Sequence, residues 1–214
     1  KFINMNENEI YYHIYFNDDK EEIKRNYFTS EDKVQKIKIV LDYRIQTLTR
    51  IFHSWKSIKK VNFINFKRNN ITHLNYLFPD SSVEEINFYD FPEKSVTNME
   101  GLFSECKRLK IINFYTFDTS NVTDMSFMFN YCSSLKYLNV SNFDTRKVTK
   151  MRYMFGEFDE LEELDLSSFR TENVIDMEGM IWKCYKLKKL NISSFNTKNV
   201  RNMIYFLSGN NLLE

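Results

Sequence analysis

The sequence contains no alanine, and its 214 residues include only four glycines, two prolines and three cysteines. Four glycines are too few to suggest a glycine-rich phosphate loop, and three widely spaced cysteines do not make a disulfide framework. The apolar runs are far shorter than the roughly 20 residues that a membrane-spanning helix requires. These shortages argue against a phosphate-loop enzyme and a disulfide-stapled domain, and we expect no membrane insertion from this segment.

The sequence also lacks an excess of either positive or negative charge. The 30 basic residues face 29 acidic ones, which gives a net charge of +1. A hydrophobic content of 43% with 28% charged residues is typical of a folded, soluble protein. The balance gives no electrostatic reason to expect a nucleic acid or an anionic membrane as partner.

The sequence is strongly repetitive. Three residue types recur at intervals of 26 residues, at Val96, Val122, Val148, Val174 and Val200, at Met99, Met125, Met151, Met177 and Met203, and at Leu109, Leu135, Leu161, Leu187 and Leu213. Upstream, Ile71 and Ile45 occupy the valine position. The chain therefore divides into six full units of 25–26 residues and a partial seventh, over residues 45–214. A fixed period of this length is typical of stacked-repeat proteins.

The apolar period changes within each unit. Over residues 122–132 apolar side chains fall at spacings of three and four, which predicts a short helix or helical turn. Over residues 135–140 the spacing changes to the alternation of a strand. Each unit is thus expected to contribute one short helical turn and one strand.

The unit "FDTSNVTDMSFMFNYCSSLKYLNVSNF" recurs as "FDTRKVTKMRYMFGEFDELEELDLSSF" and "FRTENVIDMEGMIWKCYKLKKLNISSF". It resembles the leucine-rich repeats of BspA-like surface proteins, the 25- to 26-residue class. The resemblance covers roughly residues 45–214 and implies a surface or adhesion role. The expected fold is an α/β, right-handed leucine-rich-repeat solenoid, with parallel strands on the concave face and short helical turns on the convex face.

Residues 1–44 lie outside the repeat. The segments "EIYYHIYF" and "VQKIKIVLDYRI" predict two strands, separated by a polar stretch. A stack of repeats needs its exposed end covered, so we interpret 1–44 as a β-rich N-terminal cap. The last unit stops partway, so we expect the natural chain to continue or a partner to cover this end, which allows an end-to-end contact.

The sulfur-rich spacing of methionine and cysteine raises the question of a metal site. Leu48 and Leu74 replace methionine at its repeat position, and Phe158 and Trp55 replace cysteine. A metal ligand cannot be exchanged for phenylalanine, whereas a core residue can. We therefore predict core packing, with no metal and no cofactor. Cys106 and Cys132 are expected on neighbouring coils, where a disulfide is sterically conceivable but disfavoured by its torsion.

No residues suggest catalysis. His13, His53 and His73 belong to no recognisable motif, and Glu162 and Glu163 are consecutive, so they cannot flank a glycosidic bond. We predict no catalytic residues and expect that the protein is not an enzyme.

Two polar columns run across the predicted strands. Charges of alternating sign occur at Lys59, Lys60, Glu84, Glu85, Lys110, Lys136, Glu162, Glu163, Lys188 and Lys189. An ion-pair ladder explains them better than a nucleic-acid stripe, which needs one sign. The second column is Asn62, Asn87, Asn113, Asn139, Asp165 and Asn191. Either a structural amide ladder or a polar ligand floor fits it.

Apolar residues at outward strand positions locate the expected partner-binding site. They are Ile64, Tyr89, Ile111, Tyr115 and Tyr137, whereas later units carry serine and charged residues there. Such a patch marks a contact site, unless the cap of residues 1–44 covers it. The predicted function is a non-catalytic module that recognises a protein partner through the concave face. The resemblance places it at the cell surface or outside the cell. The alternative is an intracellular scaffold subunit built into a larger, cytoplasmic assembly.

Overall fold

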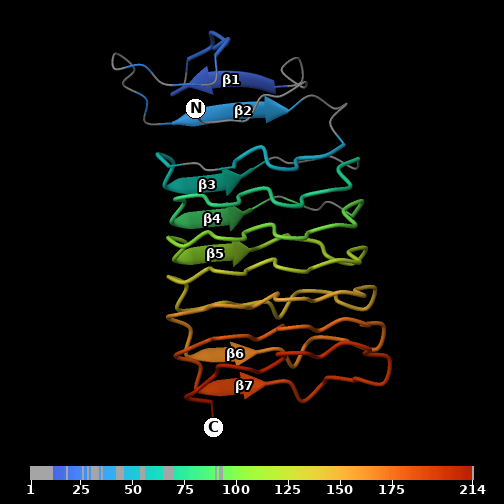
Figure 1. The fold of residues 1–214 in the computed structure, drawn as a ribbon. Helices are drawn as coiled ribbons and strands as arrows, with labels where there is room; N and C mark the ends of the chain where they lie inside the picture. The colour runs from blue at the N-terminus through green and yellow to red at the C-terminus, as the bar shows by residue number, and fades with distance from the viewer. Residues whose placement is uncertain are drawn as a thin grey trace.

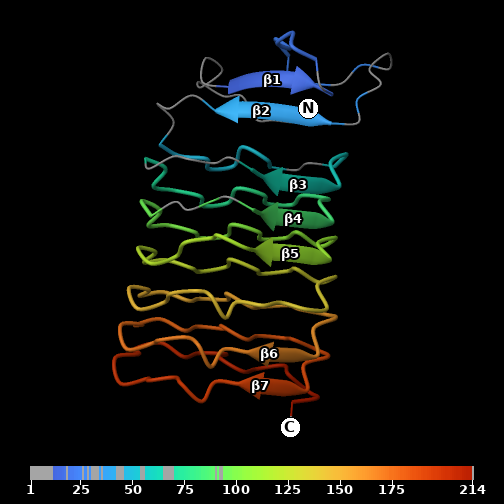
Figure 2. The ribbon, with the colours of Figure 1, turned by 180° about the vertical axis from the view of Figure 1, so that it is seen from behind.

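The structure is a computed structural model that describes residues 12–17, 19–25, 27, 29, 34, 36–41, 46–53, 56–64, 70–89, 91 and 94–213. The chain winds into flat coils that stack into a column, with the strands along one side and turns along the other (Figures 1 and 2). Single parallel bridges join equivalent residues of consecutive coils on the turn side, from Thr47↔His73 to Asp176↔Asn202. The 25–26-residue sequence period is therefore the length of one coil.

In the described residues the strands are short and form three separate sheets. An antiparallel pair consists of β1 (Tyr12–Phe16) and β2 (Ile37–Leu41). A parallel sheet contains β3 (Lys60–Phe63), β4 (Glu85–Phe88) and β5 (Ile111–Phe114). A second parallel pair consists of β6 (Glu163–Asp165) and β7 (Lys189–Asn191). The unit between β5 and β6 has no strand at residues 136–141.

The predicted right-handed α/β solenoid of the leucine-rich-repeat kind is wrong. The described residues contain no helix, and their strands make sheets of two or three strands instead of one continuous parallel sheet. The stretch 122–132, predicted as a helical turn, is a series of tight turns. Met128 N–H donates to the Met125 carbonyl and Cys132 N–H to the Phe129 carbonyl, each three residues back, whereas an α-helix requires four.

Left-handed backbone conformations explain why these turns do not continue as a helix. Phe127 has φ 58° and Tyr131 has φ 60°, and a residue with positive φ interrupts a right-handed helix. Equivalent positions in the other coils share this conformation. They form two columns, Arg50, Tyr76, Gly101, Phe127, Tyr153, Gly179 and Tyr205, and Asp80, Glu105, Tyr131, Glu157, Lys183 and Gly209.

Bonds between coils compensate for this strained backbone. Phe127 N–H donates to the Arg152 carbonyl at 2.7 Å and Tyr131 N–H to the Gly156 carbonyl at 3.0 Å. Along this stretch the backbone N–H groups alternate between two kinds of acceptor: a carbonyl three residues back in the same turn and a carbonyl of the next coil. Side chains add to the turns, as where Asp124 Oδ1 accepts from Ser126 N–H at 3.0 Å. Isolated coils cannot make these bonds, so each coil needs its neighbours.

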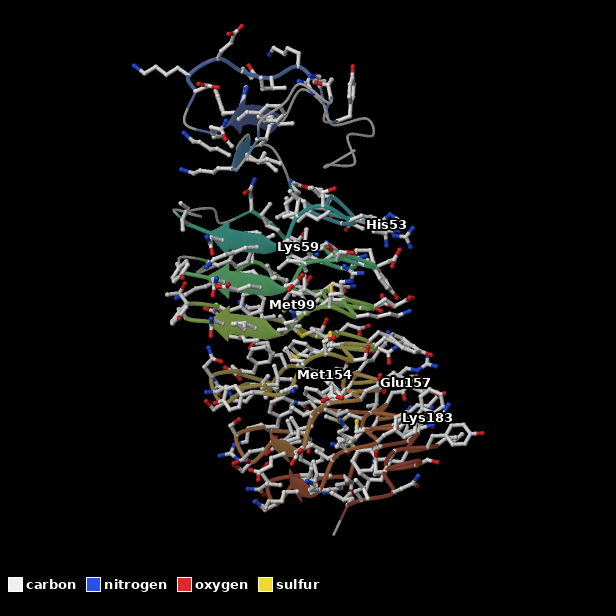
Figure 3. All side chains as sticks on the ribbon, turned by 90° about the vertical axis from the view of Figure 1, so that its left-hand side faces the viewer. His53, Lys59, Met99, Met154, Glu157 and Lys183 are labelled. Carbon is white, nitrogen blue, oxygen red and sulfur yellow. The ribbon has the colours of Figure 1, made fainter. Side chains whose placement is uncertain are left out.

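Apolar side chains fill the interior of the column. Met99 and Met154 lie inside it in Figure 3, whereas His53, Glu157 and Lys183 lie along its turn edge. Phenylalanine rings stack from coil to coil with centroids 5.0–6.1 Å apart, through Phe52, Phe78, Phe103, Phe129 and Phe155. The predicted core packing of the methionine and cysteine columns is confirmed except at Met203, which is 40% exposed, since Met125, Met151 and Cys132 are fully buried.

The N-terminal sheet packs on the same core. β1 and β2 lie within the two segments predicted as strands, and Ile14 and Phe16 of β1 join the buried cluster of the coils. Trp55 and the predicted boundary at residues 44 and 45 lie outside the described residues.

Gly101 allows a close contact on the turn side. A Cβ atom at Gly101, which has φ +59°, would lie 2.3 Å from Tyr76 Cε1. The Tyr76 ring can therefore cover this glycine, where its hydroxyl donates to Glu100 Oε1 at 3.1 Å. Burial, with help from the Glu100 carboxylate, raises the pKa of Tyr76 to about 12.

We predict that Gly101→Ala destabilises the chain and lowers the Tyr76 pKa toward its ordinary value. The left-handed conformation costs alanine about 1–2 kcal/mol, and moving the ring adds to this. Denaturant unfolding measures the loss, and NMR titration of the Tyr76 ring measures the pKa. In a Tyr76→Ala background, Gly101→Ala should cost less because no ring has to move. Equal costs in both backgrounds would contradict the proposed contact.

Candidate interaction surface

The outward side of the strands, called the strand face, carries polar and apolar columns in register. The pairing Lys60↔Glu85↔Ile111 sets equivalent residues side by side. Period-two alternation directs Ile86 and Phe88 of β4 into the core and Asn87 toward this face, where the neighbouring coils bury it. The parallel register therefore converts the repeat into rows of like positions.

The predicted ion-pair ladder is confirmed at most of its positions. Glu84 bridges Lys59 at 2.9 Å and Lys110 at 2.8 Å, while Glu85 pairs with Lys60 at 2.8 Å. In the later coils, Glu162 pairs with Lys188 and Glu163 with Lys189. Lys136 differs, because it reaches Glu160 at 4.0 Å instead of Glu162.

The pKa of Glu84 is strongly lowered by its two lysine partners. Hydrogen bonds from Lys110 and Lys59 stabilise its carboxylate and lower its pKa to about 2. The Glu84 side chain is 34% exposed, so solvent and salt screen these pairs. The ladder thus favours the correct register more than it adds to stability.

The asparagine column forms an amide ladder only in the early coils. Asn87 Nδ2 donates to Asn62 Oδ1 at 2.9 Å, and Asn113 Nδ2 donates to Asn87 Oδ1 at 2.7 Å. From Asn139 onward the column changes its partner. Its side-chain oxygen accepts instead from the backbone N–H two residues later, as Asp165 Oδ1 does from Ser167.

The sheet is interrupted where the amide ladder stops. In the described part of the chain, no backbone hydrogen bond joins residues 136–141 to β5 or to β6. Ser141 N–H bonds to Asn139 Oδ1 at 3.0 Å, a local turn that competes with strand pairing. The sequence of this unit gave no warning of the interruption, since its Leu-x-x-Leu-Asn pattern differs from the neighbouring units only by Ile112 in the one before and Asp165 in the one after.

The five residues predicted as the partner-binding site lie on the strand face and are exposed. Their exposed fractions run from 46% for Tyr89 to 73% for Tyr137. The Tyr89 and Tyr115 rings stack with centroids 5.1 Å apart and planes 8° apart. The described part of residues 1–44 does not cover them. We call this set the aromatic patch; it consists of Ile64, Tyr89, Ile111, Tyr115 and Tyr137.

Other candidate residues lie apart from the patch. The three cysteines are free thiols, and Cys132 Sγ contacts the Phe103 carbonyl at 3.3 Å. Burial raises the pKa of the Cys106 and Cys132 thiols, which disfavours the reactive thiolate. His53 and His73 are exposed, and His13 Nδ1 lies 3.2 Å from Glu22 Oε1.

The described residues lack both a cluster of metal-ligating side chains and a membrane-spanning helix. They contain no group of three or more histidine, cysteine, aspartate or glutamate residues arranged to hold a metal ion. Nor does any helix among them have the length and apolar character to cross a membrane.

Comparison with known proteins gives one match. A family model described as "Mycoplasma protein of unknown function, DUF285" matches residues 22–114 and again residues 97–213. Two overlapping matches to one model agree with the internal repetition, and together they reach across most of the chain. No curated protein and no solved structure matches the chain.

We predict that replacing Lys59 and Lys110 by methionine raises the Glu84 pKa toward its unperturbed value of 4.5. A carboxylate whose pKa is lowered on folding stabilises the fold above its unfolded pKa. That contribution is lost as the pH falls from about 4.5 toward 2. NMR titration of the Glu84 side chain measures the change, and Lys107→Met is the control. A Glu84 pKa that stays near 2 in the double variant would contradict the ladder.

Proposed function

Because the chain belongs to the DUF285 family, whose description assigns no function, we propose a function from the strand face itself. The protein is a non-catalytic recognition module that binds a protein partner through the aromatic patch. The observation that carries this proposal is the exposure of five large apolar side chains on a face that is otherwise polar. Exposed apolar clusters of this kind usually mark contact sites.

The geometry of the patch supports a binding role. Tyr89 and Tyr115 stack on each other, so their rings lose little further freedom when a partner binds. Tyrosine offers a large apolar area and a hydroxyl that can orient a partner, and it is enriched among hot-spot residues. Ile111 lies in the paired strand β5, and Tyr89 N–H donates to the Phe63 carbonyl, so this part of the patch is held on paired backbone.

The resemblance to BspA-like surface proteins supports a setting for this binding. We propose that the module acts in recognition or adhesion at the cell surface. The likeness rests on the repeating unit, such as the segment at 117–143, and the family match is consistent with it.

The last described coil supports a second candidate, a structural role in a larger assembly. Met203 and Leu207 are exposed, whereas Met177 and Ile181, one repeat earlier, are buried. Ile204, Tyr205 and Leu212 are also exposed there. Such a surface can accept another coil of the same repeat, whether from this chain or from a second molecule.

We predict that the triple variant Tyr89→Ser, Tyr115→Ser, Tyr137→Ser binds its partner at least about tenfold more weakly. Each buried hot-spot side chain typically contributes more than 1 kcal/mol, which corresponds to several-fold in affinity. Partners are captured from cell-surface extracts by the immobilised chain and identified by mass spectrometry. Their affinities for wild type and variant are then measured with purified partner.

The matched control is Ile175→Ser, Tyr185→Ser, which removes two exposed side chains that lie outside the patch. Circular dichroism and thermal melting verify that both variants fold. A captured protein that binds the control but not the triple variant supports the proposal. Equal capture by the folded triple variant would exclude the patch as the binding site.

A further inference from the structure

The interruption of the sheet leaves an open groove on the strand face. The groove has a volume of about 640 Å³ and lies between residues 136–141 and the coil that contains β6. Its lining residues are Lys136, Tyr137, Leu138, Asn139, Val140 and Ser141 on one side and Glu160, Glu162, Glu163, Asp165, Ser167 and Ser168 on the other. Sites for small ligands usually measure about 300–1,000 Å³.

Polar groups in the groove have unused hydrogen-bonding capacity. Within the described residues, no acceptor receives a hydrogen bond from Asn139 Nδ2, and the backbone N–H groups of 137–140 have no backbone partner. Asp165 accepts from Ser167 N–H at 2.9 Å but pairs with no cation in this part of the chain. The hydrogen bonds from Ser167 lower the Asp165 pKa, so the carboxylate is ionised at neutral pH.

One aromatic residue, Tyr137, lines the groove. Tyr137 is 73% exposed, and its ring presents a large apolar surface beside the polar groups. The face of an aromatic ring is electron-rich and attracts the weakly positive C–H groups of a saturated ring. An aromatic face next to amide and carboxylate acceptors therefore matches a molecule that has both an apolar C–H face and hydroxyl groups.

Charge and space exclude other ligand classes. Glu160, Glu162 and Glu163 pair with lysines, so among the groove carboxylates Asp165 carries the uncompensated negative charge, which disfavours phosphate and other anionic groups. An inserted peptide strand would need about 4.7–4.9 Å on each side. The bridge Asp124↔Lys150 is intact on the turn side, so the two coils that form the groove remain adjacent. A shallow, uncharged ligand fits better than an added strand.

We propose that this groove binds a neutral sugar residue of an oligosaccharide. One face of the pyranose ring stacks on Tyr137, and its hydroxyl groups donate to Asp165 and accept from Asn139 Nδ2. The site goes beyond the proposed protein-binding function, because it needs only Tyr137 from the aromatic patch. A glycan on a partner protein and a free oligosaccharide present the same chemistry to it.

The test measures binding of maltotriose, mannotriose and chitotriose to the folded chain by calorimetry and by NMR of labelled tyrosine rings. We expect at least one of them to bind and to shift the Tyr137 ring signals. Tyr137→Ala and Asp165→Asn should each weaken that binding at least tenfold, whereas Tyr137→Phe should retain most of it. Asp165→Asn keeps the oxygen that caps Ser167, and asparagine occupies this position in the other coils.

Two controls separate this inference from the proposed function. Tyr115→Ser removes part of the aromatic patch but lies outside the groove, so it should weaken binding of the protein partner and leave sugar binding unchanged. Sialyllactose, which is anionic, should bind more weakly than the neutral sugars. The inference is overturned if none of the three trisaccharides binds, or if the bound one is unaffected by Tyr137→Ala and Asp165→Asn.

Discussion

The backbone hydrogen bonds between equivalent residues of consecutive coils are the interaction on which the rest of the structure depends. They require the left-handed residues on the turn side, which direct alternate N–H groups along the column. Most of these residues are not glycine, so each carries a conformational cost of about 1–3 kcal/mol that only neighbouring coils can offset. Folding of one coil is therefore coupled to folding of the next. The same alignment of the coils places the apolar residues of consecutive coils in columns.

The turn side and the strand side of the column have different structural roles. The turn side maintains its bridges through every described coil, including those around residues 136–141. The strand side is therefore free to vary, because it is not needed to keep the coils in place. It carries stacked tyrosines in the early coils, an interrupted sheet in the middle and a plain ion-paired surface at the end. Both proposed binding sites lie on this variable side.

Much of the packing could be predicted from the sequence, but the helix could not be distinguished from turns. A helix and the observed series of turns would both place Val122, Met125, Met128 and Phe129 toward the interior. The apolar spacing in the sequence is therefore the same for the two conformations. Gly101 and Gly179, at equivalent positions in a sequence with four glycines, were the available signal for positive φ. Acceptors such as Asp124, two residues before a turn N–H, were a second signal.

The strand face was also predictable only in part, because the repeat period determines the register but not every side-chain hydrogen bond. Parallel register follows from the period, and this was enough to predict the Glu84 ion pairs and the amide ladder at Asn87. It was not enough to predict the groove. Asn139 Oδ1 accepts from the Ser141 N–H, and Asn139 does not extend the amide ladder that Asn113 forms with Asn87; this difference leaves no mark in the repeat pattern.

The orientation of the bonds between coils also determines how the column responds to mechanical force. A pull on the two ends of the column acts along these bonds, so they open one after another instead of shearing together. Each coil that opens releases 26 residues, or about 90 Å of extended chain. The coil containing residues 136–141 has backbone bridges on its turn side only, so fewer bonds resist its opening than resist that of the coils that contain β3, β4 and β5. A molecule built in this way lengthens in steps under tension and keeps its remaining coils folded.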